Sequence, residues 1–283
     1  MNTMEEHIVC YLDILGYKGL VNKYGSDAEK ATELMEAFEN IDSFLKQQLE
    51  IKDEILHRVF EKVQLIILSD SILITIPISR YSNELNGVPK EFDELLAYYY
   101  YLFFVRYVYI QVIIKTGHFC RGAIVKGAHF DKKFQDGSGN RFIFSPALIN
   151  AYQLQDKAVY PRIIFDDSIY KLITDLYDLI DKEYRKGVSD TIRHRMPFID
   201  HTGIRCFDIF FDLPNREQYM SKGKDLLDWL SIMKTKIYDQ LDENRVKPEI
   251  IEKYIYLINY FNNKVQLCNL DSNLLIQLNK LQF

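Results

Sequence analysis

Short apolar runs alternate with longer amphipathic stretches along the first 165 residues. Runs of about 4–8 apolar residues that end at glycine, serine or aspartate are typical of strands buried in a sheet. Five such runs predict strands at Ile8–Ile14, Val59–Leu68, Ser71–Ile78, Phe119–Gly127 and Arg162–Phe165. Only Ser69 and Asp70 separate the second run from the third, so we expect a tight hairpin turn there.

Apolar residues at helical spacing predict four helices in the same part of the chain. The predicted helices are a segment that begins at Ser26 and ends before Ile55, followed by Phe92–Thr116, Ser145–Lys157 and Asp166–Arg185. Ser26 and Glu29 match a capping box at the start of the first helix. Gly117 is placed to end the second helix, and Pro146 suits the first turn of the third.

The predicted elements follow the order strand, helix, strand, strand, helix, strand. This is the β-α-β-β-α-β order of an α+β, ferredoxin-like palm with a split βαβ unit, in which the first strand lies beside the third. One or two more strands are expected within Ile204–Phe211, and Asp131–Arg141 is a polar insertion typical of a hairpin or loop. We expect a palm domain over residues 1–215 and a helical C-terminal segment over 216–283, packed on the palm or on a second protomer.

Composition and charge restrict the class of protein. The 283 residues carry a formal net charge of −5, which argues against a protein that binds bulk nucleic acid but leaves room for a nucleotide site. The run Leu95–Ile114 is apolar enough to suggest a membrane span, but Arg106 and Gln111 interrupt it, so we expect a buried helix and no membrane contact.

The cysteines and the N-terminus favour a cytoplasmic protein. Cys10, Cys120, Cys206 and Cys268 form no Cys-x-x-Cys pair, so a zinc site is not indicated, and the first two are expected as buried thiols. Unpaired thiols fit a reducing compartment. The first six residues are acidic and lack the basic and apolar regions of a secretory signal.

Asp13 and Asp70 are the acids that the predicted topology brings together. Asp13 ends the first strand and Asp70 lies in the hairpin turn, both in apolar surroundings. Two carboxylates this close repel one another unless they are protonated or bridged by cations. Two Mg²⁺ or Mn²⁺ ions would suit such a pair and would support phosphoryl transfer. The alternative is structural, with Asp13 capping a loop and Asp70 an ordinary turn acid.

Several segments in this order resemble the class III nucleotidyl cyclases. Tyr11-Leu-Asp-Ile-Leu-Gly-Tyr17 resembles the first metal motif of that family, and Leu68-Ser-Asp-Ser-Ile-Leu73 resembles the second. Arg121-Gly-Ala-Ile-Val-Lys-Gly127 is similar to the family's Arg-x-Gly-Ile-x-x-Gly strand, although its Gly122 falls one place early. Ser145–Ala158 is similar to the helix that carries the transition-state residues. The resemblance covers Ile8–Phe165 and leaves the rest of the chain uncovered.

The resemblance implies a set of roles for individual residues. Asp13 and Asp70 would hold both metal ions, with the carbonyl of Ile14 as a further ligand. The turn Leu15, Gly16 and Tyr17 would meet the triphosphate through its N–H groups, and Arg121 would neutralise phosphate charge. The ribose 3′-hydroxyl would attack the α-phosphorus, giving a 3′,5′-cyclic nucleotide and pyrophosphate. The family's site forms between two protomers, which implies a homodimer.

The chain departs from the family at the positions that would stabilise the transition state and recognise the base. Asn150 lies one place after the expected asparagine, and Gln153 stands where an arginine is expected. They are three residues apart on one helix and can act as an amide pair, with Lys126, Lys132 or Lys133 as candidate cations. The position that reads adenine is Gln64, an amide that both donates and accepts, so GTP, UTP and CTP stay open.

Two other interpretations remain at the level of sequence. One is a catalytically inert palm protein that binds a nucleotide or a partner, and the other is a palm enzyme that joins nucleotides. No Gly-Gly-Asp-Glu-Phe or Gly-Gly-Asp-Asp string is present to favour the second. By analogy with bacterial anti-phage relatives that make cyclic CMP and cyclic UMP, a divergent pyrimidine cyclase with a role in defence is a further expectation.

Overall fold

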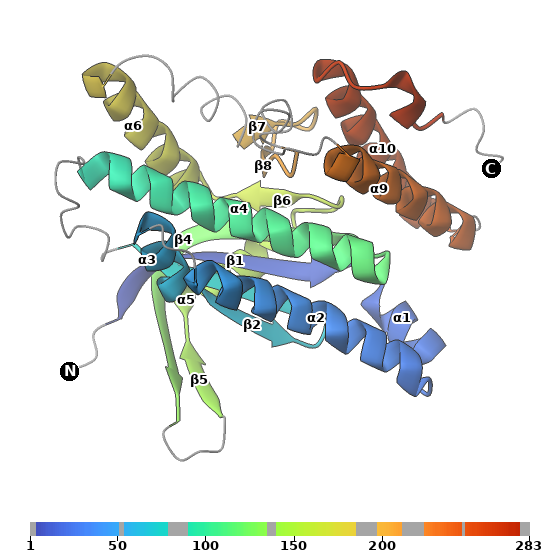
Figure 1. Cartoon of the computed structure of the whole chain (residues 1–283), viewed down its shortest axis with the longest axis horizontal. Coiled ribbons are helices and arrows are strands. Elements are labelled where there is room, and N and C mark those ends of the chain that lie inside the picture. The colour runs from blue at the N-terminus through green and yellow to red at the C-terminus, as the bar shows by residue number, and fades with distance from the viewer. Residues whose placement is uncertain are drawn as a thin grey trace.

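The structure is a computed structural model that describes residues 4–50, 54–78, 90–134, 140–184, 197–210, 224–244 and 247–277. Its centre is a mixed sheet with the strand order β2-β3-β1-β4-β6-β8-β7 (Figure 1). The strands are β1 (Glu5–Ile14), β2 (Gln64–Leu68), β3 (Ser71–Pro77), β4 (Cys120–Lys133), β5 (Arg141–Phe144), β6 (Ile163–Phe165), β7 (Pro197–Ile199) and β8 (Arg205–Phe207).

The order β2-β3-β1-β4 confirms the predicted α+β fold with a ferredoxin-like palm. Strand β1 pairs antiparallel with β3 on one side and with β4 on the other, so the first strand does lie beside the third. Strands β2 and β3 form the predicted tight hairpin. Strand β6 joins β4 in parallel, and β8 and β7 extend that edge beyond the palm.

Helices cover both faces of the sheet. They are α1 (Tyr17–Tyr24), α2 (Ala28–Leu49), α3 (Glu54–Lys62), α4 (Lys90–Thr116), α5 (Pro146–Gln155), α6 (Asp167–Tyr184), α9 (Lys224–Glu243) and α10 (Pro248–Leu267), with a short 3₁₀ helix η2 (Ser272–Leu274). The larger core contains Ile8, Cys10, Leu12 and Ile14 of β1 and residues of the long helix α4. The smaller core contains Val9 and packs the opposite face against Ala147 and Ala151 of α5.

Two predicted element boundaries need correction. The segment Val59–Lys62, predicted as the start of a strand, is helical, and the strand begins only at Gln64. Its apolar residues Val59 and Phe60 are buried in the larger core, which a short amphipathic helix achieves as well as a strand. Helix α2 begins at Ala28, and Asp27 rather than Ser26 accepts the N–H of Glu29.

Other sequence signals are confirmed. Gly117 ends α4 with φ +74°, and its N–H donates to the carbonyl of Ile113. Ser145 caps α5 by accepting the N–H of Leu148, and Pro146 occupies the first turn. The polar insertion is a hairpin, because β4 continues to Lys133 and pairs with β5. The tip of the hairpin at 135–139 lies outside the described residues.

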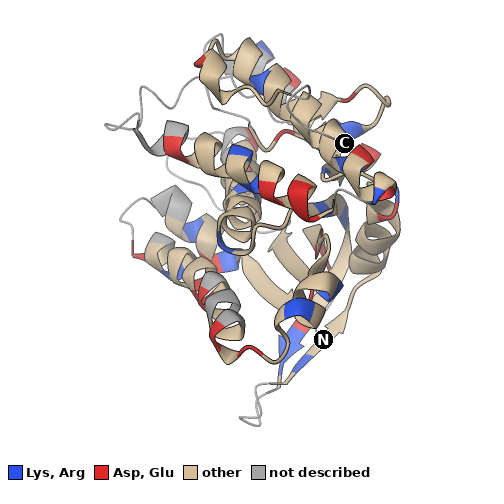
Figure 2. Cartoon of the chain, turned by 90° about the vertical axis from the view of Figure 1, so that its right-hand side faces the viewer, with Lys and Arg blue, Asp and Glu red and all other residues tan. Residues whose placement is uncertain are grey.

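The helix α4 is buried and carries its arginine inside the protein. Arg106 donates from Nε to the carbonyl of Ile209 at 2.7 Å and lies over the ring of Trp229. None of the helices described here is long and apolar enough to cross a membrane. Seen from the side in Figure 2, acidic and basic residues are both scattered over the described helices, as on ordinary solvated surfaces.

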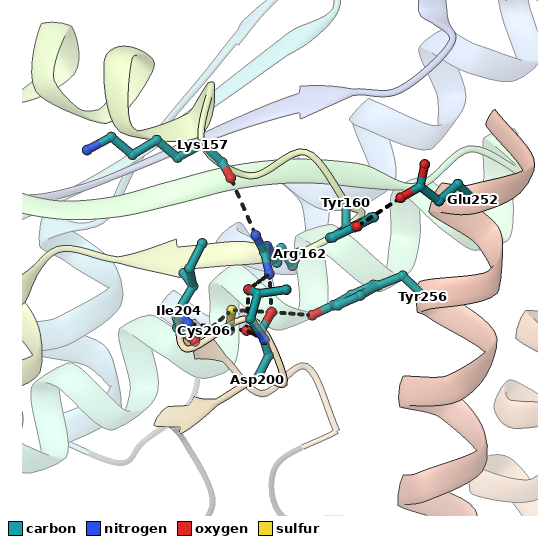
Figure 3. A network of polar contacts seen from close by, with 9 residues as sticks. Lys157, Tyr160, Arg162, Asp200, Ile204, Cys206, Glu252 and Tyr256 are labelled. Atoms are coloured by element: carbon teal, nitrogen blue, oxygen red, sulfur yellow. Dashed lines mark hydrogen bonds and ion pairs between the residues drawn. The ribbon is translucent and has the colours of Figure 1, made fainter. Parts of the chain in front are cut away.

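The C-terminal helices pack on the palm of their own chain. Residues of α9 and α10, including Met233, Leu257 and Phe261, belong to the same core as β1 and α4. Figure 3 shows the polar contacts that join α10 to the sheet edge. Tyr256 of α10 donates to Asp200, which forms a buried ion pair with Arg162 next to β6. The predicted boundary at residue 215 lies outside the described residues.

Candidate functional site

Strand β1 places the Asp13 carboxylate between two partner strands. Asp13 is directly opposite Ser71 of β3 and Arg121 of β4, so the three side chains lie on the same face of the sheet. This is the face that α5 covers, because Val9, four residues earlier and so on the same face of the strand, belongs to the smaller core. The strand pairing therefore gathers an acid, a hydroxyl and a guanidinium at one end of the sheet.

Arg121 forms an ion pair with Asp13. Its Nε donates to Oδ2 of Asp13 at 2.8 Å, and the two side chains are 27% and 18% exposed. Gln155, at the C-terminal end of α5 and 1% exposed, completes the group. With its amide in the orientation that satisfies both atoms, the Gln155 oxygen accepts from Nε and Nη2 of Arg121. The Nε–H of Arg121 is thus shared between the Asp13 carboxylate and the Gln155 amide oxygen, and Nη2 also donates to Gln155.

Asp70 lies beside this group but in solvent. The Ser69-Asp70 turn, with φ +54° at Ser69, is tied to the first strand because the N–H of Ile14 donates to the Asp70 carbonyl at 2.8 Å. Ser71 donates to the Asp70 carboxylate at 3.3 Å and also contacts the Tyr11 hydroxyl. The sequence predicted apolar surroundings for Asp70, and this prediction is wrong, because Asp70 is exposed. A turn at the rim of the sheet cannot be covered by the cores on its two faces.

The turn after β1 is fixed by contacts with His118. The N–H of Leu15 donates to the carbonyl of Phe119 at 2.8 Å, and the Leu15 carbonyl lies 2.8 Å from Nδ1 of His118. Gly16 has φ +79°, and a β-carbon there would lie 3.2 Å from the His118 ring. Burial lowers the pKa of His118 below its ordinary value. The Leu15 N–H is therefore already used, whereas the first turn of α1, from Tyr17, leaves N–H groups without helical partners.

Helix α5 presents the predicted transition-state residues to solvent. Asn150 and Gln153 are exposed, and the buried stripe of the helix is Ala147, Ala151 and Gln155. Ile149 and Tyr152, at 59% and 54% exposed, share the outer surface. The structure thus brings Gln155 to Asp13 and Arg121, and it does not bring Asn150 or Gln153 to them within one chain.

The remaining predicted residues lie apart from the acids. Lys126 pairs in register with Ile8 on the face opposite Asp13, and its ammonium lies 3.3 Å from Glu6. Gln64 accepts from Arg141, the first residue of β5, at 3.3 Å. Lys132 and Lys133 are exposed on the β4–β5 ribbon, which projects from the body in Figure 1.

The sequence did not point to Gln155. For Lys126, in contrast, its position on the opposite face from Arg121 could have been predicted from the alternation of side chains along a strand. Residues 121 and 126 are an odd number apart on one strand, so their side chains must point to opposite faces. Gln155 carried no such signal, because a glutamine at helical spacing is ordinarily a surface residue. Gln155 lies eight residues after Ala147, a spacing that places both on one face of the helix, and this spacing is the signal that could have indicated its burial.

The donors present suit a magnesium or manganese ion only in part. Asp13 and Asp70 supply carboxylate oxygens, the ligands that Mg²⁺ prefers, and one or two carboxylates with substrate phosphates are its usual protein site. Among the described residues no three His, Cys, Asp or Glu side chains gather as a closed metal centre. The two acids therefore fit a metal that arrives with a polyphosphate better than a resident ion.

Gly122 explains why β1 and β4 lie so close at this site. A β-carbon there would lie 2.4 Å from the Tyr11 carbonyl oxygen and 2.7 Å from Cδ2 of Leu12. Only glycine fits such an approach without moving the backbone. The glycine that falls one place early in the motif thus sits where the register between Asp13 and Arg121 is set.

The fold is similar to those of solved nucleotidyl cyclases. The adenylyl cyclase CyaB from P. aeruginosa is 16% identical, with 61% of this chain and 82% of that one covered and a TM-score of 0.38. The guanylyl cyclase domain of the RhoGC fusion protein from the aquatic fungus Blastocladiella emersonii is 14% identical, with 72% and 93% covered and a TM-score of 0.41.

A third similar structure is described as a class III adenylyl cyclase-like ATP-binding protein from Pseudomonas aeruginosa. It is 11% identical, with 65% of this chain and 38% of that one covered and a TM-score of 0.40. No protein-family model and no curated protein sequence matches the chain. The chain is thus structurally similar to class III adenylyl and guanylyl cyclase catalytic domains, at low sequence identity.

Proposed function

We propose that the chain converts a nucleoside triphosphate to its 3′,5′-cyclic monophosphate and pyrophosphate, using Mg²⁺ or Mn²⁺. The observation that carries this proposal is the group at the end of β1, where Arg121 is bonded to Asp13 and Asp70 lies on the adjacent turn. Two carboxylates beside a guanidinium suit a metal–triphosphate, because the acids bind the cation and the arginine binds phosphate oxygen.

In this proposal the acids bind metal, and Arg121 and helix α1 bind phosphate. Asp13 and Asp70 would hold the metal ions, which when bound would activate the ribose hydroxyl and neutralise phosphate charge. Arg121 would turn one of its N–H groups to the triphosphate while Gln155 keeps the guanidinium in place. The first turn of α1 would offer its free N–H groups and its positive dipole end to the phosphates.

The reaction needs no covalent contribution from the protein. The 3′-oxygen forms a bond to the α-phosphorus. The bond between the α-phosphorus and the oxygen that bridges to the β-phosphate breaks, so that pyrophosphate leaves, and the hydroxyl proton is released to water. The chain's task is to align these atoms and to stabilise the charge that develops.

A homodimer would bring the exposed amides of α5 to the reacting phosphate. Asn150 and Gln153 face away from Asp13 of their own chain, so only a second protomer would receive them. Mixing an Asp13→Asn protein with an Asn150→Ala/Gln153→Ala protein tests this arrangement. Random exchange of protomers should restore about a quarter of wild-type activity, since half the dimers then hold one intact site. No restoration in exchanged dimers would contradict the shared site.

The second candidate is an inert palm protein that binds a nucleotide. The specific observation in its favour is that Arg121 already neutralises Asp13, which lowers the local need for a metal. Isothermal titration with a non-hydrolysable triphosphate, with and without Mn²⁺, separates the two. Tight binding of the analogue without metal, together with no cyclic product from the natural triphosphates, would favour the inert protein.

A further inference from the structure

A separate cavity lies between the palm and the C-terminal helix α9. It has a volume of about 700 Å³, within the range of small-molecule sites. Its apolar walls come from α1, α2 and β2 and include Leu20, Val21, Met35, Phe38 and Ile67. Lys115, Thr116 and Gly117 at the end of α4, and Lys236, Asp239, Gln240 and Glu243 of α9, form the other side.

This cavity is distinct from the group around Asp13. Ile67 pairs with Ile72 of β3, whose side chain belongs to the larger core on the α4 face. Asp13 and Arg121 point to the opposite face, where Gln155 covers them. The two places share only their rims, because Tyr17 and Ser69 line the cavity and are the chain neighbours of Gly16 and Asp70.

One positive charge beside the cavity has no partner among the described residues once the ion pairs of the other charged residues are assigned. Glu243, which lines the cavity, is paired with Lys23 at 3.0 Å. Lys236 lies 3.9 Å from Asp239, the limit of an ion pair. Within the described part of the chain, Lys115 forms no ion pair. One ammonium is thus left over beside a mostly apolar wall.

We propose that this cavity is a second binding site, for a small molecule with an aromatic or aliphatic body and one anionic group. The apolar walls and the rings of Tyr17, Tyr24 and Phe38 receive the body. The ammonium of Lys115 receives the anion, and that of Lys236, 3.9 Å from Asp239, adds positive charge on the same side of the cavity. Because α9 supplies one wall, the site gives the C-terminal helices a role beyond packing.

The test uses 8-anilinonaphthalene-1-sulfonate, an aromatic sulfonate, as probe in a fluorescence titration of the full chain. We expect saturable binding of the sulfonate. The neutral N-phenyl-1-naphthylamine should bind with an affinity lower by about tenfold, since it lacks the charge. Lys236→Met and Lys115→Met, which keep the aliphatic stem, should each weaken the sulfonate by about three- to tenfold and leave the neutral probe unchanged.

Two further variants locate the probe. Ala31 lines the cavity from an exposed position on α2, so Ala31→Trp adds bulk there without replacing a core residue. It should weaken both probes by about tenfold or more. Lys171→Met, a matched change on the exposed face of α6, should alter neither.

Equal affinity in wild type and Ala31→Trp, at unchanged melting midpoint, would overturn the site. It would place the probe elsewhere, for example on the exposed Phe142 and Phe144. Equal affinities for the charged and neutral probes would overturn the anionic part of the proposal. Neither result depends on nucleotide turnover.

Discussion

The Nε of Arg121 donates to Oδ2 of Asp13 at 2.8 Å, across two strands whose residues 13 and 121 are paired in register. The acid that ends an apolar strand is therefore compensated inside the chain. The buried Gln155 oxygen accepts from the same Nε and from Nη2 of Arg121. An ion pair this close to solvent contributes little stability by itself, so its geometry matters more for binding than for folding.

The buried amide of Gln155 should be worth more than the exposed amide of Gln153 on the same helix. Gln155→Leu leaves Arg121 short of an acceptor in a buried place, and we expect it to cost about 1–3 kcal/mol of unfolding free energy. The matched change Gln153→Leu should stay within about 0.5 kcal/mol. Urea denaturation of both variants measures the difference, and equal costs would contradict the assigned burial of α5.

Gly122 should tolerate no side chain. Gly122→Ala places a β-carbon 2.4 Å from the Tyr11 carbonyl oxygen, so strands β1 and β4 must separate at the site. We expect a loss of about 3 kcal/mol or more in unfolding free energy, at the upper end of overpacking effects. Gly19→Ala, in an open position on α1, should instead stabilise by about 0.5–1 kcal/mol. Thermal melts of the two variants should therefore shift in opposite directions.

The pair of Arg162 and Asp200 should anchor α10 to the sheet edge. Both side chains are buried, and Tyr256 donates to the same carboxylate at 3.0 Å. Arg162→Leu leaves that carboxylate buried without its cation, at an expected cost of about 3–5 kcal/mol. Glu252→Gln, at the exposed contact with Tyr160, should cost less than about 0.5 kcal/mol. Hydrogen exchange in α10 should rise in the first variant only.

Stability should fall in mild acid because of His129. The ring is 1% exposed, and burial, with the neighbouring His7 as a smaller cause, lowers the pKa of His129 to about 4. The folded state therefore binds this proton more weakly than the unfolded state does. Its contribution is complete above about pH 6.5 and is lost as the pH falls toward 4, by on the order of 2–3 kcal/mol.

Urea denaturation between pH 7.5 and 4.5 checks this dependence. His129→Asn keeps a polar group for Ser145, which lies 2.8 Å from Nδ1, but removes the titration. The variant should lose less stability than the wild type over this range. Parallel pH profiles for the two proteins would show that another group controls the acid response.

The sequence predicted the order of the palm strands and that Asp13 and Asp70 lie close together. Apolar runs and their order led to the pairing of β1 with β3, and hence to Asp13 and Asp70 at one end. The register with β4 could not be predicted, because the close approach at Gly122 depends on atoms of two distant segments. The orientation of α5 was hidden for a similar reason, since its stripe of two alanines and a glutamine is only weakly apolar.

The boundary between α3 and β2 was missed because short apolar segments fit either element. Val59 and Phe60 face the core from a helix, and the strand that follows begins at Gln64. The contact between α9 and the palm depends on helix faces that pattern alone does not assign. Long-range packing, not local propensity, decided each of these points.

The central claim is that Asp13 and Asp70 act on a metal–triphosphate. Incubation of the purified protein with ATP, GTP, CTP and UTP and Mn²⁺, followed by mass analysis of the products, tests it most directly. We predict a 3′,5′-cyclic nucleotide from at least one triphosphate, reduced about a hundredfold or more in Asp13→Asn and in Asp70→Asn. The control Asp166→Asn, after β6, should keep its activity. No cyclic product from any triphosphate in a folded, dimeric sample, or product that survives the loss of Asp13, would contradict the account.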